Sequence, residues 1–177
     1  MEHQDHTLSI FLDLSKAFDC VSHDILLQKC KNYGIRGLPY QWIKSYLYDR
    51  KQFVQISNSR SSFINTKFGV PQGSVLGPLL FIIYVNQINS SLAKGKAIQY
   101  ADDTTLCFSA KTFDDLEVQT FVNLNSCIQQ FNDINLIANL HKTNYIKFSL
   151  RSYIENSFQL NVVIDEIVID EVESTNF

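Results

Sequence analysis

Three aspartates stand where a folded chain could bring carboxylates together. Asp13 ends the apolar run Ile10-Phe11-Leu12, a pattern typical of a buried strand. Asp102 and Asp103 are neighbours in Tyr100-Ala101-Asp102-Asp103-Thr104, between two short apolar segments that predict a hairpin. A buried strand and a hairpin tip would hold these side chains at fixed positions.

Converging carboxylates would need a counter-charge, since a like-charge pair at about 4 Å costs roughly 4 kcal/mol near a protein surface. Mg²⁺ and Mn²⁺ remove this repulsion and prefer oxygen ligands. Two such ions can activate an attacking oxygen and stabilise a leaving one in nucleotidyl transfer. Taken singly, each acid has a plainer interpretation: Asp102-Asp103 as a polar turn, Asp13 as a strand-end cap, and Asp19 as a turn residue before the next helix.

Length and composition indicate one soluble globular domain with room for a tail. The chain has 177 residues, of which 45% are hydrophobic and 19% charged. These values argue against a disordered, collagen-like or coiled-coil chain. No apolar stretch approaches the roughly 20 residues of a membrane span, and the N-terminus lacks the basic region of a secretory signal. The four cysteines contain no Cys-x-x-Cys pair, which favours reduced thiols inside the cell, in either nucleus or cytoplasm.

Charge is distributed unevenly along the chain, although the net value is only -3. Residues 29–67 carry eight bases against one acid, whereas the segment after Tyr153 carries six acids and no base. A local excess of bases can face a polyanion, and it can equally be a solvated surface.

Hydrophobic periodicity predicts an α+β fold, with one antiparallel sheet and helices on one face. The predicted helices cover residues 22–33, 39–47, 79–88 and 113–132. In the second of these we expect Trp42 and Ile43 on the apolar stripe, and in the last we expect Phe121 on the buried face. The predicted strands cover residues 7–12, 52–56, 62–68, 98–101, 104–108, 145–150, 161–164 and 167–169, with turns at 57–60 and 165–166.

Four segments resemble the motifs of reverse transcriptases, in the family's order. Residues 11–19, Phe-Leu-Asp-Leu-Ser-Lys-Ala-Phe-Asp, resemble motif A, and residues 69–81, which begin Gly-Val-Pro-Gln-Gly-Ser, resemble motif B. Tyr-Ala-Asp-Asp at 100–103 resembles motif C, and Asn-Leu-His-Lys-Thr at 139–143 is similar to motif D. The residues of these motifs most resemble those of polymerases from non-LTR (LINE-type) retrotransposons of the jockey and CR1 kind. The resemblance extends over residues 7–177, the end of which resembles the lead-in to motif E.

This resemblance implies an RNA-directed DNA polymerase whose palm is an antiparallel sheet with a ferredoxin-like core. It implies that Asp13 and Asp102 bind two Mg²⁺ or Mn²⁺ ions and that Asp103 supports this site. The implied partners are an RNA template, a DNA primer and deoxynucleoside triphosphates. It implies no membrane partner and leaves the oligomeric state open.

The resemblance also implies roles for residues outside the acidic cluster. Phe18 would be the steric gate under the sugar that rejects a 2′-hydroxyl. Gln72 and Gly73 would hold the incoming nucleotide beside the template base. Lys142 would be the general acid that protonates the leaving pyrophosphate. The plainer interpretations are a core position for Phe18, a loop hydrogen bond for Gln72 and a solvated charge for Lys142.

The sequence also departs from the family's pattern. Leu140 and His141 separate Asn139 from Lys142 where Asn-Pro-x-Lys-Thr is common, and Gln130 stands at the usual Trp of the preceding helix. The chain begins at motif A, so we expect residues 1–177 to be a palm fragment without fingers or thumb.

Three other functions were weighed against a catalytic palm. An inert retroelement remnant with weak or no nucleic-acid binding would share the same fold. An RNA-binding module of the RRM type would need an aromatic and basic RNP1 segment, and a nucleotide cyclase would need its own Gly-rich signature. The sequence contains neither of these two signals.

Overall fold

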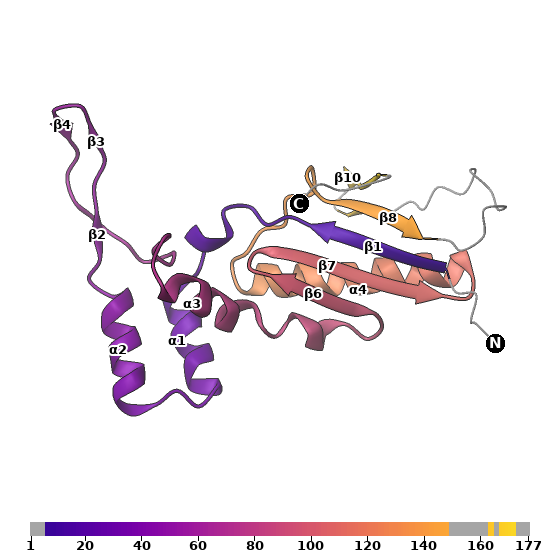
Figure 1. The fold of residues 1–177 in the computed structure, drawn as a ribbon, viewed down its shortest axis with the longest axis horizontal. Coiled ribbons are helices and arrows are strands. Elements are labelled where there is room, and N and C mark those ends of the chain that lie inside the picture. Colours follow the sequence, from indigo (N-terminus) through magenta and orange to yellow (C-terminus); the bar gives the residue numbers. More distant parts are fainter. Residues whose placement is uncertain (1–5, 149–162, 165–166, 173–177) are drawn as a thin grey trace. The chain divides into compact units, whose positions relative to one another are not determined.

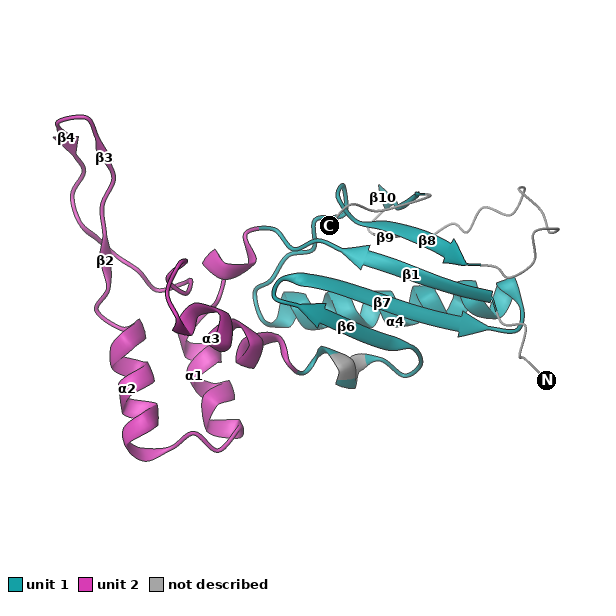
Figure 2. Ribbon diagram, in the orientation of Figure 1, with its two compact units in different colours: residues 1–15, 87–177 teal, residues 16–86 magenta. Residues whose placement is uncertain are grey.

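The computed structural model describes residues 6–148, 163–164 and 167–172. The chain divides into two compact units (Figure 2). Unit 1 comprises Met1–Ser15 and Gln87–Phe177, and unit 2 comprises Lys16–Asn86. Of the helices within the described ranges, none is both long and apolar enough to cross a membrane.

Unit 1 is built on a five-stranded sheet with the order β11-β8-β1-β7-β6 (Figure 1). Its strands are β1 (His6–Leu12), β6 (Lys96–Tyr100), β7 (Asp103–Ala110), β8 (Asn144–Phe148) and β11 (Asp170–Glu171). All neighbours are antiparallel except β11, which runs parallel to β8. This one parallel pairing differs from the predicted all-antiparallel sheet, because a strand that returns by a long connection, not by a hairpin, can join in either direction.

A single long helix, α4 (Phe113–Asp133), covers one face of this sheet and packs against β1 and β7 (Figure 1). Thr112 caps it by accepting a hydrogen bond from the Asp115 backbone N–H at 3.2 Å. The sheet and helix bury a shared apolar core, which includes Leu8, Ile10, Leu106, Phe108, Leu116, Leu124 and Phe131. The predicted α+β architecture with a helix on one face of the sheet is therefore confirmed.

The prediction that Phe121 lies on the buried face of α4 is wrong, since its side chain is 53% exposed. The buried positions of α4 follow steps of three and four residues from Leu116 through Thr120 and Leu124. Phe121 lies five residues after Leu116, which turns it by about 140° around the helix axis. Its side chain therefore points away from the sheet.

Polar side chains of α4 hold the segment that leads into β6. Asn123, which is 3% exposed, accepts hydrogen bonds through Oδ1 from the backbone N–H groups of Ala93 and Lys94 at 2.7 and 3.1 Å. Gln130 donates through Nε2 to the Gln87 carbonyl at 3.1 Å. The 3₁₀ turn η2 (Ile88–Ser91) lies between these two anchors. The β6–β7 hairpin thus emerges from a segment fixed to the helix.

Unit 2 contains the 3₁₀ turn η1 (Ala17–Asp19) and the helices α1 (His23–Asn32), α2 (Gly37–Leu47) and α3 (Leu76–Val85). Helix α1 packs against α3 and α2. Lys29 is buried between α1 and α3, where its Nζ donates to the Tyr84 carbonyl, and desolvation lowers its pKa. Helix α3 begins three residues before the predicted Leu79, because Pro78 is compatible with the first turn of a helix.

Helix α2 is less buried than its apolar stripe predicts. Trp42 is 60% exposed and Ile43 is half-buried, whereas Leu47 is fully buried. The described elements pack on α2 mainly through α1. One neighbour covers only the end of the stripe, so the expected burial of Trp42 is wrong.

A hairpin connects α2 to the loop before α3. At its base β2 (Lys51–Gln52) pairs with β5 (Ile64–Asn65), and at its tip β3 (Gln55–Ile56) pairs with β4 (Ser59–Arg60). The predicted hairpin is confirmed, but its turn is shorter than residues 57–60. Ile56 pairs directly with Ser59, and Ser57 has a φ of 53°. Two-residue turns with positive φ match the twist of paired strands and are therefore favoured.

Two short strands near the C-terminus, β9 (Val163–Ile164) and β10 (Ile167–Val168), pair with each other in antiparallel orientation. The predicted turn Asp165-Glu166, the end of the 145–150 strand and the motif E lead-in at 173–177 lie outside the described residues.

Candidate active site

The sheet of unit 1 brings the strand-end carboxylate and the hairpin carboxylates to the same edge. Leu12 pairs with Thr104 across β1 and β7, and Tyr100 pairs with Asp103 across β6 and β7. One step beyond the first pair, Asp13 follows Leu12 and Asp103 precedes Thr104. Extending this register by one residue sets Asp13 opposite Asp103, next to the hairpin tip.

Alternation along the strands decides which way these acids face. Leu12 and Thr104 are each 2% exposed and belong to the side of the sheet that α4 covers. Successive side chains of a strand point to opposite faces, so Asp13 and Asp103 point to the face away from α4. Asp13 and Asp102 are half-buried and Asp103 is exposed. The acids are thus open to a ligand that approaches the uncovered face.

The hairpin tip that carries Asp102 is conformationally strained. Its two-residue loop is Ala101-Asp102, and Ala101 has a φ of 53°. A left-handed conformation costs an L-residue roughly 1–2 kcal/mol. Such outliers cluster where a backbone must present a functional side chain. Asp102 directly follows this strained residue in the loop.

The motif D segment is fastened to the chain immediately after β1. Asn139 donates its backbone N–H to the Asp13 carbonyl at 2.8 Å, and Ser15 donates to the Ile137 carbonyl at 2.8 Å. Lys142 follows in a turn in which its backbone N–H donates to the Asn139 carbonyl at 3.1 Å. The Lys142 side chain is exposed. Leu140 and His141, which stand where the family's motif has Pro-x, lie in this turn, so the backbone of Lys142 stays close in the fold to the backbone of Asp13.

The carboxylates do not form a ready-made ligand cluster. In residues 6–148, 163–164 and 167–172, no three His, Cys, Asp or Glu side chains are grouped so that they could hold a metal ion. Carboxylates without a cation repel one another, so charge alone favours a spread arrangement. The donors that the sheet edge offers are all oxygens, which fits the ligand chemistry of Mg²⁺ and Mn²⁺.

Unit 2 holds Phe18 rigidly. The ring of Phe18, in η1, stacks on the ring of Phe81 from α3, with 4.4 Å between centroids and 23° between planes. Phe81 is fully buried, whereas Phe18 is half-buried. One side of the Phe18 ring is therefore packed and the rest is open, which is the setting that a steric gate requires.

The loop after motif A and the loop of motif B form one hydrogen-bonded assembly. Gly69 donates its backbone N–H to Val21 at 2.8 Å, and Val70 donates to the Phe18 carbonyl at 2.9 Å. Gly69 has a φ of +86°, and a Cβ there would lie 3.1 Å from the Asp19 carbonyl oxygen. Only glycine satisfies both conditions without a shift of backbone. His23, which is 5% exposed, contacts the Gly69 carbonyl through Nε2 at 2.8 Å.

Gln72 is oriented by an acid that sequence reasoning assigned only to a turn. Its Nε2 donates to Asp19 Oδ1 at 3.0 Å, and both side chains are otherwise exposed. The neighbouring Gly73 has a φ of +75° and open space where a Cβ would stand. Asp19 and Gln72 lie 53 residues apart. No local spacing could therefore have revealed this contact, and no sequence signal singled out His23 either.

The sequence-predicted site residues fall in both units. Asp13, Asp102, Asp103 and Lys142 belong to unit 1, where the sheet edge and the Asn139 contact bring them into one region. Phe18, Gln72 and Gly73 belong to unit 2, where the hydrogen-bonded loops bring them together.

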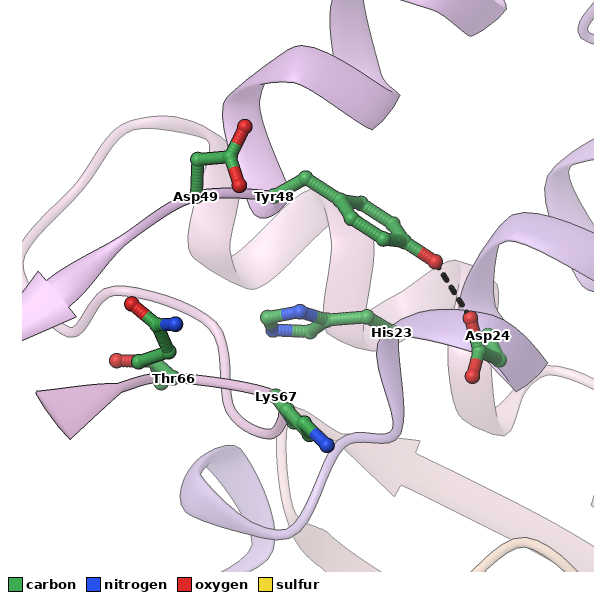
Figure 3. A pocket seen from close by; sticks show the side chains of 7 residues that line it. His23, Asp24, Tyr48, Asp49, Thr66 and Lys67 are labelled. Atoms are coloured by element: carbon green, nitrogen blue, oxygen red, sulfur yellow. Dashed lines mark hydrogen bonds between the residues drawn. The ribbon is translucent and has the colours of Figure 1, made fainter.

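A pocket of about 280 Å³ lies elsewhere in unit 2, between the start of α1, the end of α2 and the base of the hairpin (Figure 3). It is lined by His23, Asp24, Tyr48, Asp49, Asn65, Thr66 and Lys67. Tyr48 donates its hydroxyl to Asp24 Oδ1 at 2.6 Å, and this hydrogen bond raises the pKa of Tyr48. None of the sequence-predicted site residues lines this pocket.

Comparison with known proteins agrees with the site's geometry. Residues 1–163 match the profile of the family described as "Reverse transcriptase (RNA-dependent DNA polymerase)". The chain belongs to the reverse transcriptase family. The resemblance seen in motifs A to D is therefore confirmed, because the match spans all four.

Curated relatives place the chain among non-LTR retrotransposon sequences. It is 37% identical over 117 residues to "Probable RNA-directed DNA polymerase from transposon BS" of Drosophila melanogaster, covering 62% of this chain and 13% of that protein. It is 31% identical over 159 residues to the corresponding protein of transposon X-element from the same organism, covering 85% of this chain and 17% of that protein. The chain thus spans well under a fifth of the length of these relatives.

Solved structures share the fold. Apo telomerase from Candida tropicalis, truncated from its C-terminal domain, superposes with a TM-score of 0.62 at 16% identity, covering 84% of this chain and 32% of that chain. Telomerase from Candida albicans in complex with a fragment of telomeric RNA gives 0.61 at 13% identity, covering 87% and 28%. The α+β polymerase palm predicted for this chain is therefore confirmed as its fold.

Proposed function

We propose that this chain is the catalytic palm of an RNA-directed DNA polymerase from a non-LTR retrotransposon, with residues 1–177 as one palm segment. It would extend a DNA primer along an RNA template with deoxynucleoside triphosphates, inside the cell. One observation carries the proposal: the β1–β7 register sets Asp13 beside the Asp102-Asp103 tip in a chain of the reverse transcriptase family.

Divalent cations are the fitting cofactor, since reverse transcriptases generally use them. Asp13 and Asp102 would hold two Mg²⁺ or Mn²⁺ ions, with Asp103 as support, on the face of the sheet that α4 leaves uncovered. The ions would supply charge stabilisation for nucleotidyl transfer. The pairing of Tyr100 with Asp103 and the hydrogen bond from Asn139 to the Asp13 carbonyl keep the two acidic segments in place.

The unit 2 residues would select and hold the nucleotide. Phe18, packed on Phe81, presents a rigid ring, and a rigid ring penalises an added 2′-hydroxyl by steric overlap. Gln72, held by Asp19, presents its remaining amide atoms toward solvent, where a nucleotide could accept or donate hydrogen bonds. Gly73 leaves room for a base to approach the backbone.

Lys142 would handle the proton of the leaving group. Its exposed ammonium is a point charge suited to phosphate oxygens, and its Nζ proton can pass to a leaving pyrophosphate. The backbone hydrogen bonds from Asn139 to Asp13 and from Lys142 to Asn139 support this role, because they keep the turn of Lys142 near the backbone of Asp13.

A second candidate is an inert remnant of the same fold. It is favoured by the six acidic residues after Tyr153, which oppose the binding of a polyanion.

A graft separates the two candidates. Residues 7–148 would replace the matching segment of a complete, active non-LTR polymerase, and primer extension on an RNA template with Mg²⁺ would be measured. The catalytic proposal expects extension that Asp102→Asn/Asp103→Asn abolishes. A graft that folds and binds template but does not extend primers would identify this palm as inert.

A further inference from the structure

The hairpin of unit 2, residues 51–65, displays an unusual amount of apolar surface. Its five large apolar side chains are Phe53, Val54, Ile56, Phe63 and Ile64, which are 38%, 64%, 72%, 60% and 63% exposed. Scattered exposed apolar residues are ordinary, but a contiguous group on one short element marks an interaction site.

The register sorts these side chains onto two faces. Alternation along residues 51–56 sets Val54 and Ile56 on the face of Gln52 and its partner Ile64, and this face is aliphatic. The second strand carries one extra residue between Arg60 and Ile64, so its own alternation is interrupted there. Lys51 pairs with Asn65 on the opposite face, which also carries Phe53 and Phe63. The two phenylalanine rings meet edge to face, with centroids 5.1 Å apart and planes at 77°. The hairpin thus has one aliphatic face and one aromatic face.

Arginine joins the aromatic face. The Arg60 guanidinium carbon lies 4.2 Å from the centroid of the Phe53 ring, and its Nη2 donates to Gln55 Oε1 at 3.3 Å. The guanidinium thus lies over the Phe53 ring and is also held by Gln55. Phe63, beside this stack, remains the more exposed of the two rings.

The charge around the hairpin restricts what can bind there. Residues 50–67 contain Arg50, Lys51, Arg60 and Lys67 and no acidic residue. A purely apolar protein partner has no use for this excess of positive charge, whereas a polyanion with flat apolar rings uses both features. Single-stranded nucleic acid has this combination, because its bases stack on aromatic rings and guanidinium planes while its phosphates meet cations.

We propose that the aromatic face of this hairpin binds single-stranded nucleic acid, with a base stacked on Phe63 and phosphates against Arg60 and Lys51. If the chain is the proposed polymerase, the bound strand is the unpaired RNA template. This identification of the strand rests on the proposed function. The hairpin would then guide the template independently of the carboxylates, which belong to unit 1.

The test measures binding by the full chain without metal, primer or nucleotides. The purified chain or a variant is added at low salt to a labelled oligouridylate, or to a labelled oligothymidylate of equal length. The rise in fluorescence anisotropy gives the affinity of each protein for each oligonucleotide. Phe63→Ala is the test and Ile64→Ala is the matched control, since the two neighbours are equally exposed but lie on opposite faces. Circular dichroism verifies that each variant is folded.

We expect Phe63→Ala to weaken binding of the oligouridylate by about 5- to 150-fold, the loss typical of one stacked base, and Ile64→Ala to change it by less than about twofold. Arg60→Gln should lower the slope of log affinity against log salt by about 0.7, because one phosphate contact is lost. Tighter binding of oligouridylate than of oligothymidylate supports the assignment to an RNA template, and the reverse preference overturns that assignment.

Three outcomes would overturn the proposal: no binding by the parent chain, equal losses in both variants, or self-association that Phe63→Ala abolishes while the oligonucleotide is ignored. Binding is measured without catalysis, so a chain that binds in this way but gives an inert graft upholds the hairpin site and refutes only the polymerase. An active graft whose affinity for template is unchanged by Phe63→Ala upholds the polymerase and refutes the hairpin site.

Discussion

Asp13, Asp102 and Asp103 place three negative charges at one edge of a sheet, so a bound cation should stabilise the fold. At 100 times the dissociation constant a ligand adds about 2.7 kcal/mol, which corresponds to roughly 5–10 °C in melting temperature for a chain of this size. We expect Mn²⁺ to produce such a rise in the parent and none in Asp102→Asn. Thermal unfolding with and without metal measures this.

The control is Asp133→Asn, which removes one exposed charge from α4 and should keep the metal response. Without metal, Asp102→Asn should be as stable as the parent or more so, because it relieves repulsion. An apo variant that is markedly less stable would show that Asp102 is a structural residue.

Phe18 should decide which sugar is accepted. In the grafted polymerase, Phe18→Val removes the ring that we propose to face the 2′ position and should improve incorporation of ribonucleotides relative to deoxyribonucleotides by roughly 10- to 100-fold. Phe18→Tyr keeps the ring and should leave discrimination intact. Single-nucleotide extension with each triphosphate measures the ratio. If Phe18→Val discriminates between the two sugars as well as the parent does, Phe18 is not a steric gate and its stacking on Phe81 is a packing contact only.

At the scale of elements, α4 is the largest single contribution to the core of unit 1, and its two apolar sides should respond very differently to truncation. Leu124 is fully buried, so Leu124→Ala should lower the free energy of unfolding by about 2–5 kcal/mol. Phe121 is half-exposed, so Phe121→Ala should change it by about 0.5 kcal/mol or less. Urea denaturation measures both, and similar losses would mean that α4 packs on the sheet with a different face.

The pairing of β8 with β11 should weaken at alkaline pH. Burial, with the nearby Glu171 carboxylate, raises the pKa of Tyr145 to about 12 from an ordinary value of 10. The neutral phenol therefore stabilises the fold fully below pH 10, and this stability is lost as pH rises through the folded-state pKa. At pH 11 the loss should be about 1.4 kcal/mol relative to pH 8.

Tyr145→Phe isolates this effect, since it keeps the ring and removes the ionisable hydroxyl. The quantity to measure is the difference in unfolding free energy between the parent and Tyr145→Phe at pH 8 and at pH 11, because effects common to both proteins cancel in it. A difference that is independent of pH would contradict the assignment. The ion pair between Lys147 and Glu171, 2.7 Å long, is present in both proteins.

At the scale of the whole molecule, the isolated 177-residue chain should show little or no polymerase activity. It spans 13–17% of the length of its matched relatives, and positioning of triphosphate and template accounts for roughly 7–11 kcal/mol of a catalysed barrier. Losing half of that lowers the rate by about several hundredfold or more. Primer extension by the purified chain should therefore match that of Asp102→Asn/Asp103→Asn. Robust synthesis that the double substitution abolishes would make this chain a minimal polymerase.

Local pattern was sufficient for most elements and for the identity of the candidate residues. Short apolar runs predicted β1 and the β6–β7 hairpin, and a helical apolar period predicted α4. These features depend on neighbours within a few residues, so the sequence states them directly. The four motifs likewise identified the family, because each is a short contiguous string.

Contacts between distant segments were decided only by the tertiary structure. Asp19 orients Gln72 across 53 residues, β11 joins β8 in parallel, and Trp42 stays exposed because α1 covers only part of α2. Burial and pairing depend on which other element arrives at a surface, and no short window of sequence carries that information. The sequence by itself therefore determined which side chains could do chemistry, and the folded sheet determined that Asp13 and Asp103 stand side by side, since register is set by the pairing of whole strands.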